Sequence, residues 1–371
     1  MTTRPIDIDE GDLSKIREVG YDLDVKDKSG TFMLRDENVL QSQTWFDGVE
    51  LMPLADALAG YDWLREIAWT LVDPDKDDKT RAIKQFEDEH GANGMFIRVK
   101  KGAKINMPLQ SCFYIKEAMN QQKAHNIIYL EDDSELHVIN GCASSIHAEN
   151  AQHWSVTETF VGKNATLTFT MIHAWGPEIE TYPRSGALVE EGGLYVSNYI
   201  SLREAKYVEM YPYARLVGKG ANARFYSVIL APPGADLDLG GRAYLDAPDT
   251  GAEVINRTVS TGGHVINRGH LVGGAKDAHG FMECNAIIVG EGLVHAIPEL
   301  EGRLEDLALN HEAAVGRISQ EEIDYLRTRG FTEEQARALI ITGFLNVSIK
   351  GLPAELQEQI AEMIEMAAKG M

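Results

Sequence analysis

A cysteine and a histidine–glutamate pair are the residues of this sequence whose types could serve metal chemistry. They lie in "GFMECNAIIVGEGLVHAIPELEGRLEDLALNHEAAVGRIS", residues 280–319, where Glu312 follows Cys284 by 28 positions and His311 directly precedes it. A thiolate, an imidazole and a carboxylate together suit iron, and the soft sulfur favours a cluster over magnesium or calcium. Taken alone, a free cysteine in an apolar segment is typical of a core residue.

These side chains can meet only if the chain coils so that positions one turn apart lie side by side. From about residue 95 the sequence consists of short alternating apolar runs separated by Gly, Asn or Asp. The segments "VKKGAKINMPL", "VGKNATLTFTMI" and "VGKGANARFYSVI" share a valine, a Gly-Lys or Lys-Gly turn, an alanine and a strand-like run. This recurrence fits a β-sandwich or a parallel β-helix. We favour the β-helix, because hairpin turns such as Asn-Gly are scarce.

A parallel β-helix would bring the candidate metal ligands together. Its neighbouring strands lie about 4.8 Å apart, and a coil of roughly 20 to 30 residues matches the gap between Cys284 and Glu312. Changes in the sequence pattern then predict three regions. Residues 1–92 are mixed and contain helices, residues 93–318 form the β-helix core, and residues 319–371 are helical.

The C-terminal region has the clearest helix signals. Two capping-box patterns predict a helical hairpin, with Gly330 ending its first helix. The boxes are formed by Ser319 with Glu322 and by Thr332 with Gln335. A further amphipathic helix is predicted from Pro353 onward.

Composition and motifs exclude several classes of function. A formal net charge of -22 makes nucleic acid and membrane surfaces poor partners. No apolar run approaches the roughly 20 residues that cross a bilayer, and the N-terminus lacks the apolar centre of a signal peptide, so we expect a cytoplasmic protein. The three cysteines form neither a disulfide framework nor a CxxC knuckle. Because a P-loop, a G-x-S-x-G elbow and an H-E-x-x-H motif are all missing, we expect no enzyme activity of the chain itself.

Five longer segments between about residues 92 and 347 resemble segments of a known protein family. They are "GMFIRVKKGAKINMPLQSCFYI", "LEDDSELHVINGCASSIHAENAQHWSVTETFVGKNATLTFTMIHAW", "ARFYSVILAPPGADLDLGGRAYLDAPDTGAEVINRTVSTGG", "INRGHLVGGAKDAHGFMECNAIIVG" and "NHEAAVGRISQEEIDYLRTRGFTEEQARALIITGFL". The chain resembles the SufB/SufD family of scaffolds in the SUF iron-sulfur cluster assembly system, and SufB more than SufD. The resemblance implies a mostly β fold, with a right-handed parallel β-helix flanked by helical regions.

The resemblance also implies the site and the cofactor. Cys284 in "MECNAIIVG" matches the family's cysteine ligand, Glu312 in "NHEA" matches its glutamate partner, and His311 precedes that glutamate as in SufB. The implied cofactor is a transient iron-sulfur cluster of undetermined type, which an isolated aerobic preparation need not retain. Because this chain carries both Cys284 and Glu312, we expect a homodimer, or a dimer with a SufD-like paralogue, that passes its cluster to acceptor proteins.

In the family the C-terminal helices dock onto a SufC-type ABC ATPase. The partner-binding residues expected here are Ile323, Tyr325, Leu326, Arg329, Gly330, Phe331, Ala336, Ile340 and Phe344. One departure concerns sulfur entry, since "SGALVEEGG" has no thiol where SufB members usually carry a second cysteine. Two alternatives stay open: a SUF-complex adaptor without its own cluster, and a polysaccharide-active β-helix enzyme.

Overall fold

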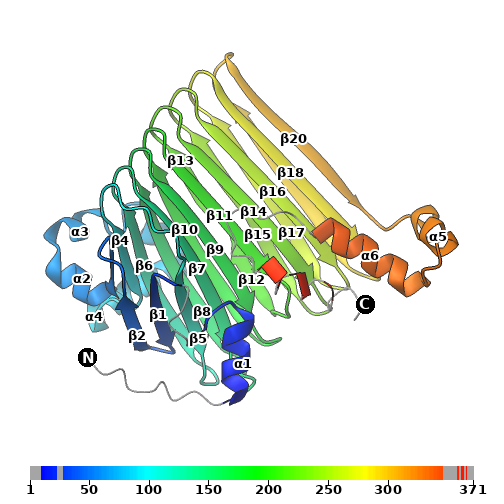
Figure 1. The fold of residues 1–371 in the computed structure, drawn as a ribbon, viewed down its shortest axis with the longest axis horizontal. Coiled ribbons are helices and arrows are strands. Elements are labelled where there is room, and N and C mark those ends of the chain that lie inside the picture. Colours follow the sequence, from blue (N-terminus) through cyan, green and yellow to red (C-terminus); the bar gives the residue numbers. More distant parts are fainter. Residues whose placement is uncertain (1–9, 23–27, 346–356, 359–360, 363–364, 366–371) are drawn as a thin grey trace.

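The computed structural model describes residues 10–22, 28–345, 357–358, 361–362 and 365. Its centre is a coil of strands in which each turn contributes to two parallel sheets (Figure 1). The coil makes about 8 turns, and the mostly β fold with a parallel β-helix core is confirmed. Because successive strands within each sheet run parallel, the β-sandwich alternative is wrong.

The first sheet contains ten strands, all parallel except β2, which joins β1 antiparallel. In spatial order they are β2 (Asn38–Thr44), β1 (Gly30–Arg35), β5 (Leu109–Ile115), β7 (Glu135–Ser144), β9 (Thr166–Ala174), β11 (Leu194–Ser201), β14 (Asn222–Ala231), β16 (Gly251–Ser260), β18 (Ala278–Ile288) and β20 (Leu307–Gly316).

The second sheet faces the first across the core and ends in β3, which pairs antiparallel with β4. In spatial order its strands are β19 (Leu293–Gly302), β17 (His264–Gly273), β15 (Asp236–Leu245), β12 (Tyr207–Met210) with β13 (Tyr213–Leu216), β10 (Glu180–Val189), β8 (Gln152–Val161), β6 (Gln121–Leu130), β4 (Met95–Val99) and β3 (Val49–Pro53). The break between β12 and β13 falls at Tyr211 and Pro212, and proline has no N–H to donate to a ladder.

Strands from the first 92 residues continue both sheets. β1 pairs in parallel with β5, and β3 pairs antiparallel with β4. Antiparallel strands β2 and β3 therefore close the N-terminal end of the coil. At the other end the terminal strands are β19 and β20.

One corner of the coil is built from residues with left-handed backbone conformation. A residue with positive φ recurs once per turn: Gly102, Asp133, Asn164, Gly192, Gly220, Asp249 and Asp277. Each donates its N–H to a carbonyl of the next turn, as Asn164 does to Glu191 at 2.9 Å. Gly, Asn and Asp adopt this conformation at the lowest cost. The recurring Gly-Lys and Lys-Gly segments of the sequence therefore mark turns of the coil.

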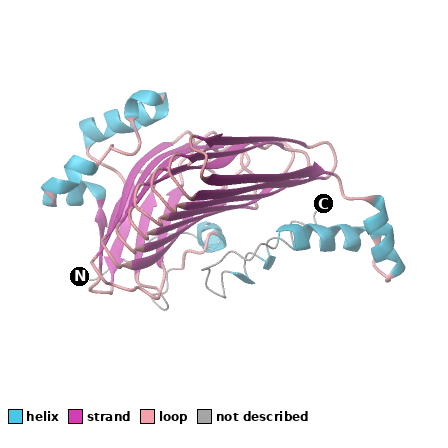
Figure 2. Ribbon diagram, turned by 90° about the horizontal axis from the view of Figure 1, so that it is seen from above, coloured by secondary structure: helices cyan, strands magenta, loops and turns pink. Residues whose placement is uncertain are grey.

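Helices lie at both ends of the coil, and α1 (Glu10–Glu18) packs on the outer face of the first sheet (Figure 2). The others are α2 (Leu54–Gly60), α3 (Asp62–Ile67), the 3₁₀ turn η1 (Pro74–Lys76), α4 (Asp78–His90), α5 (Gln320–Thr328) and α6 (Glu333–Leu345). The helix predicted from Pro353 lies outside the described residues. None of the helices in the described ranges is both long enough and apolar enough to cross a membrane.

Both predicted capping boxes of the C-terminal hairpin are confirmed. Ser319 N donates to Glu322 Oε2 at 3.3 Å, and the Ser319 side chain caps the first turn of α5 in return. Thr332 N donates to Gln335 Oε1 at 2.9 Å, and Gln335 N donates to Thr332 Oγ1 at 3.2 Å. Gly330 has a φ of 96° and so allows the reversal between α5 and α6.

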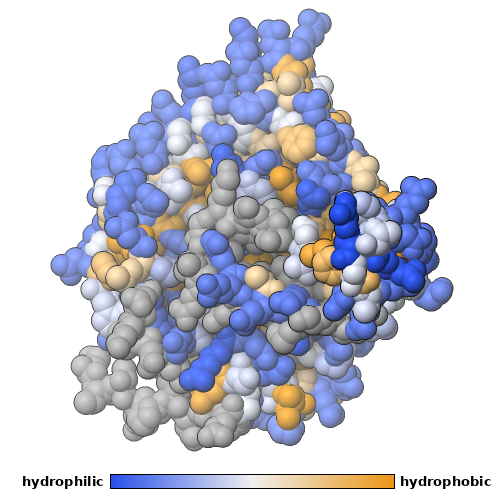
Figure 3. All heavy atoms as spheres, turned by 45° about the vertical axis from the view of Figure 1, so that its right-hand side comes forward, coloured by the Kyte–Doolittle hydropathy of each residue, from blue (hydrophilic) through white to orange (hydrophobic). Residues whose placement is uncertain are grey.

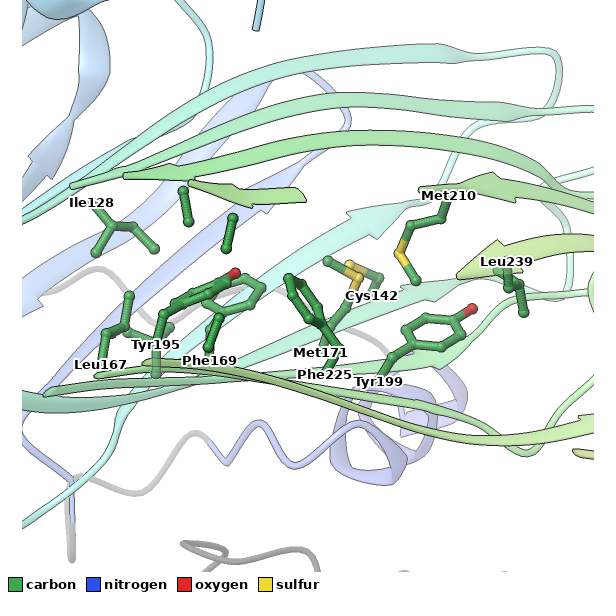
Figure 4. Packing of buried hydrophobic residues seen from close by; sticks show 14 of the residues in the cluster. Ile128, Cys142, Leu167, Phe169, Met171, Tyr195, Tyr199, Met210, Phe225 and Leu239 are labelled. Atoms are coloured by element: carbon green, nitrogen blue, oxygen red, sulfur yellow. The ribbon is translucent and has the colours of Figure 1, made fainter. Parts of the chain in front are cut away.

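The core fills the space between the two sheets (Figure 4). Phe169, Tyr199 and Phe225 come from the first sheet, Met210 from the second, and their side chains meet in the interior. Cys142 packs among them with 1% of its surface exposed, as expected of a core cysteine.

A second apolar cluster lies on the outer face of the first sheet, where helices cover it. Ile16 of α1 and Val19, which directly follows α1, pack in this cluster, and so do Ile341 and Leu345 of α6. The β-helix therefore carries the C-terminal hairpin against the outside of the sheet that contains β18 and β20.

Candidate functional site

Cys284 lies on β18 and points into the core. Side chains along β18 alternate between the interior and the outer face, and Met282, Cys284 and Ala286 are the buried set. Cys284 has 0% of its surface exposed. The alternation of apolar and polar residues in "FMECNAII" thus places the thiol inside and Glu283 outside.

The neighbouring strand β20 brings His311 and Glu312 beside β18. Parallel pairing sets Met282 opposite His311, Glu283 opposite Glu312 and Cys284 opposite Ala313. The three predicted ligands therefore lie on adjacent strands, as the coil argument required. They do not share a face, however: His311 faces inward with Cys284, whereas Glu312 is exposed on the outer face.

The length of one turn causes this separation. Ser260 on β16 pairs with Ile288 on β18, but His264 on β17 pairs with Leu293 on β19. Residues 289–292 therefore form a connection one residue longer than residues 261–263 in the turn beneath. A shift of one residue in register moves a side chain to the opposite face of a sheet.

Burial holds the thiol in its neutral form. Desolvation raises the pKa of Cys284, and a weak contact from Asn256 opposes this shift. Asn256 pairs with Cys284 from β16, and its Nδ2 lies 3.9 Å from the sulfur. The thiolate is the form that binds metal, so exposure of Cys284 would favour ligation.

A charged network covers the outer face over the same two strands. Arg257 on β16 forms an ion pair with Glu283, and Asn285 Nδ2 donates to Glu283 Oε1 at 2.7 Å. The Arg257 guanidinium lies 5.3 Å from the ring centroid of Phe344 on α6. This network links the C-terminal hairpin to the residue next to Cys284.

His311 retains hydrogen-bonding capacity. Its side chain is half-buried, and its Nε2 atom is buried without a hydrogen-bond partner among the described residues. Thiol and imidazole on one inner face are a suitable pair of ligands for iron. Nowhere in the described ranges do three His, Cys, Asp or Glu side chains of one chain converge into a metal site. A complete set of protein ligands would therefore require a rearrangement or a second chain.

Comparison with known proteins identifies the family. The family model described as "SUF system FeS cluster assembly, SufBD core domain" matches residues 113–344. The chain belongs to the SufBD family. An iron-sulfur cluster assembly SufBD family protein of Archaeoglobus fulgidus is 42% identical over 361 residues, covering 97% of this chain and 96% of that protein. Another, of Methanothermobacter thermautotrophicus, is 37% identical and covers 100% of this chain and 90% of that protein.

The SufBD relatives include a SufB. The iron-sulfur cluster assembly protein SufB of Bacillus subtilis is 29% identical over 308 residues, which cover 81% of this chain and 65% of that protein. The SufBD match includes β18, β20 and most of the C-terminal hairpin. The recognition made from sequence motifs is thus confirmed at the level of the family.

The expected partner-binding residues of this SufBD chain differ in exposure. Four of them are exposed: Tyr325, Arg329, Gly330 and Phe331. Three are half-buried: Leu326, Ile340 and Phe344. Ile323 and Ala336 are buried, with 1% and 0% of their surfaces exposed. These last two lie in the interior, and the exposed residues are accessible on the surface of the hairpin.

Sequence reasoning missed three residues that surround the candidate ligand Cys284: Asn256, Arg257 and Glu283. For Asn256 and Arg257, the length of one coil would have been a sufficient signal. Asn256 precedes Cys284 by one turn, and Arg257 lies beside it on the opposite face. Reading one coil back from the cysteine would have found both.

Proposed function

We propose that this SufBD protein is a scaffold that holds a nascent iron-sulfur cluster at the contact between two scaffold chains. The cluster is the cargo. A SufC-type ABC ATPase docked on the C-terminal hairpin hydrolyses ATP, so the scaffold performs no turnover of its own. The second scaffold is another copy of this chain or a SufD-like paralogue, and acceptor proteins take the finished cluster.

The terminal turn of the coil supports an interface at this end. In the part of the chain that the structure describes, β20 has no strand on its outer edge. Large apolar side chains are exposed on this turn: Leu293, Leu300, Leu304 and Val315. The surface turned toward this end shows apolar areas within a mostly hydrophilic surface (Figure 3). An exposed strand edge with apolar side chains is well suited to pair with another chain.

The observation that carries the proposal is the position of Cys284 one strand inside this edge. β20 is the terminal strand of the first sheet, and it alone lies between the sheet's edge and β18. His311 on β20 shares the inner face with Cys284. Displacement of β20 would therefore expose the thiol and remove the desolvation that raises its pKa, and it would move His311 together with the strand.

The hairpin offers a physical connection from the ATPase to the thiol. Phe344 on α6 covers Arg257, and Arg257 is paired with Glu283, the neighbour of Cys284. A movement of α6 would disturb this ion pair. ATP binding can drive such a movement if the closed ATPase binds one position of the hairpin more tightly than the other.

Replacement of Cys284 tests the scaffold function. The complex with the ATPase would be reconstituted anaerobically with ferrous iron and sulfide, and the visible absorbance per complex measured. We expect Cys284→Ala to lose most of this absorbance. Cys112→Ala, which removes another fully buried cysteine, is the matched control and should retain it. Wild-type absorbance in the Cys284→Ala complex would refute the role of this thiol.

One observation favours the adaptor function as a second candidate. Cys284 is buried and Glu312 lies on the opposite face, so the described residues of one chain present no converged ligand set. An adaptor predicts that wild type and Cys284→Ala bind the ATPase equally and that neither complex gains cluster absorbance. The same reconstitution therefore separates the two candidates.

A further inference from the structure

A polar cavity of about 610 Å³ lies on the outer face of the second sheet, away from β18 and β20. The segment before α4 forms one wall, and strands β10, β13 and β15 form the floor. These three strands lie side by side (Figure 1), and β13 pairs with both of the others. Its volume is in the range of small-molecule sites.

The charge of this cavity is opposite to that of the chain. Four arginines and one lysine line it, against three aspartates, while the whole chain carries a net charge of -22. All three aspartates are paired: Asp77 with Arg184, Asp246 with Arg215 at 2.7 Å, and Asp73 with Lys76 at 3.8 Å. Glutamates outside the lining also pair with Arg184 and Arg303. A local excess of positive charge in a cleft attracts anions.

Arg242 on β15 is the cation that the protein leaves without a carboxylate. It makes no ion pair within the described residues, and its Nη2 atom donates to the Tyr211 carbonyl at 3.2 Å. Its guanidinium lies 4.4 Å from the Tyr211 ring centroid and 5.8 Å from that of Tyr213. Stacking on aromatic rings orients a guanidinium while leaving donors available for a planar or tetrahedral anion.

Three buried polar atoms of the cavity lining have no hydrogen-bond partner among the residues that the structure describes. They are Thr80 Oγ1, Tyr211 Oη and Arg242 Nε. The Thr80 residue has 1% of its surface exposed. Buried polar groups are nearly always hydrogen-bonded, so three orphan groups in one cavity indicate a bound polar species.

A break in one strand and a glycine in its neighbour make room for the two tyrosine rings near Arg242. The interruption between β12 and β13 releases Tyr211 from the ladder, because Pro212 cannot donate there. Gly186 on β10 lies beneath the Tyr213 ring, and a Cβ at this position would come within 2.8 Å of a ring atom. The tyrosines are thus held over Arg242 by the strands themselves.

We propose that this cavity binds a small phosphate-bearing anion. Arg242 would contact the phosphate oxygens through its free donors, and the hydroxyls of Thr80 and Tyr211 would complete the contacts. A phosphate group offers several acceptor oxygens, which suits the mixture of guanidinium and hydroxyl donors better than a single carboxylate. This site is separate from the cluster site and does not depend on the proposed scaffold function.

Calorimetric titration of the full-length protein with inorganic phosphate and with pyrophosphate tests the proposal. We expect Arg242→Gln to weaken binding by about tenfold, the usual size for loss of a charge-assisted hydrogen bond to phosphate. Thr80→Val removes one hydroxyl with little change of shape and should also weaken binding. Arg224→Gln, on β14 of the other sheet, is the control and should bind as wild type does.

Several results would overturn the proposal. They are the absence of binding to wild type, equal binding by wild type and Arg242→Gln, and equal weakening by Arg242→Gln and Arg224→Gln. Binding of citrate as tightly as pyrophosphate would overturn the assignment to phosphate. Circular dichroism of each variant would establish that it is folded, and Cys284→Ala should bind the anion unchanged.

Discussion

Removal of Glu158 should detach the segment between α3 and α4 from the second sheet. Glu158 on β8 is fully buried and accepts the backbone N–H groups of Trp69, Leu71 and Val72. Its Oε2 atom also lies 3.1 Å from His125 Nε2. One carboxylate therefore holds three backbone donors that have left regular secondary structure.

The contacts give the expected magnitude for Glu158→Ala. A buried donor left without a partner costs about 1–3 kcal/mol, and the two partly buried donors should fall at the low end of that range. With the buried Val72 donor and the loss of one His125 partner, we expect a loss of about 4 kcal/mol in the free energy of unfolding. Glu158→Gln keeps an acceptor oxygen and should cost about half as much.

Thermal unfolding and hydrogen exchange would measure this effect. A loss of about 4 kcal/mol corresponds to a decrease in melting temperature of about 5 °C for a protein of this size. Exchange should accelerate most at residues 69–72, because these amides lose their acceptor. The control is Glu135→Ala, since Glu135 is exposed and lies 3.9 Å from Lys104, a pair worth at most about 1 kcal/mol. If Glu158→Ala behaves like this control, the buried carboxylate does not hold the segment.

Two further predictions concern pH and the corners of the coil. Burial lowers the pKa of His125, but the carboxylates of Glu158 and Glu87 outweigh this effect and raise the pKa above 6.5. The His125 imidazole in turn holds the pKa of Glu87 below 4.5 despite burial. The contribution of this charged His125 cluster to the free energy of unfolding is therefore present below pH 6.5 and fades as pH rises through the raised pKa of His125. In acid the contribution is lost as Glu87 is protonated. His125→Gln should lower the melting temperature most between about pH 4.5 and about pH 6.5, and a difference that grows toward alkaline pH would contradict this reasoning. Gly218→Ala should destabilise the protein more than Gly220→Ala. A Cβ at position 218 would lie 1.9 Å from the Glu191 nitrogen, whereas a Cβ at position 220 would meet only open space and the strain of a φ of 70°. Equal melting temperatures of the two variants would refute this prediction.

Local chemistry explains how much of the fold could be predicted. The Gly-Lys and Lys-Gly segments with a following alanine recur because each coil needs a left-handed residue at one corner, as Asn164 and Gly220 provide. The capping boxes at Ser319 and Thr332 are equally local, since every partner lies within three residues. In both cases the neighbours along the chain supply the hydrogen bonds.

Contacts between distant segments could not be read in this way. Within the mixed region 1–92, the sequence pattern did not show that residues 49–53 form β3 ahead of α2 and α3, because β3 pairs with β4, more than 40 residues further along the chain. The polar cavity joins residues from Leu71 to Arg303, and the buried atoms of Thr80 and Arg242 that lack a hydrogen-bond partner among the described residues are recognisable only after burial is known.

The sequence alone favoured a coil of parallel strands over a β-sandwich, placed Cys284 in an alternating strand, and put His311 and Glu312 about one coil length later. The tertiary structure decided which of these side chains share a face. One additional residue in the connection 289–292 sets Cys284 opposite Ala313 and turns Glu312 outward. The spacing of residues fixes a coil length only approximately, whereas the face of a strand depends on a single residue of register.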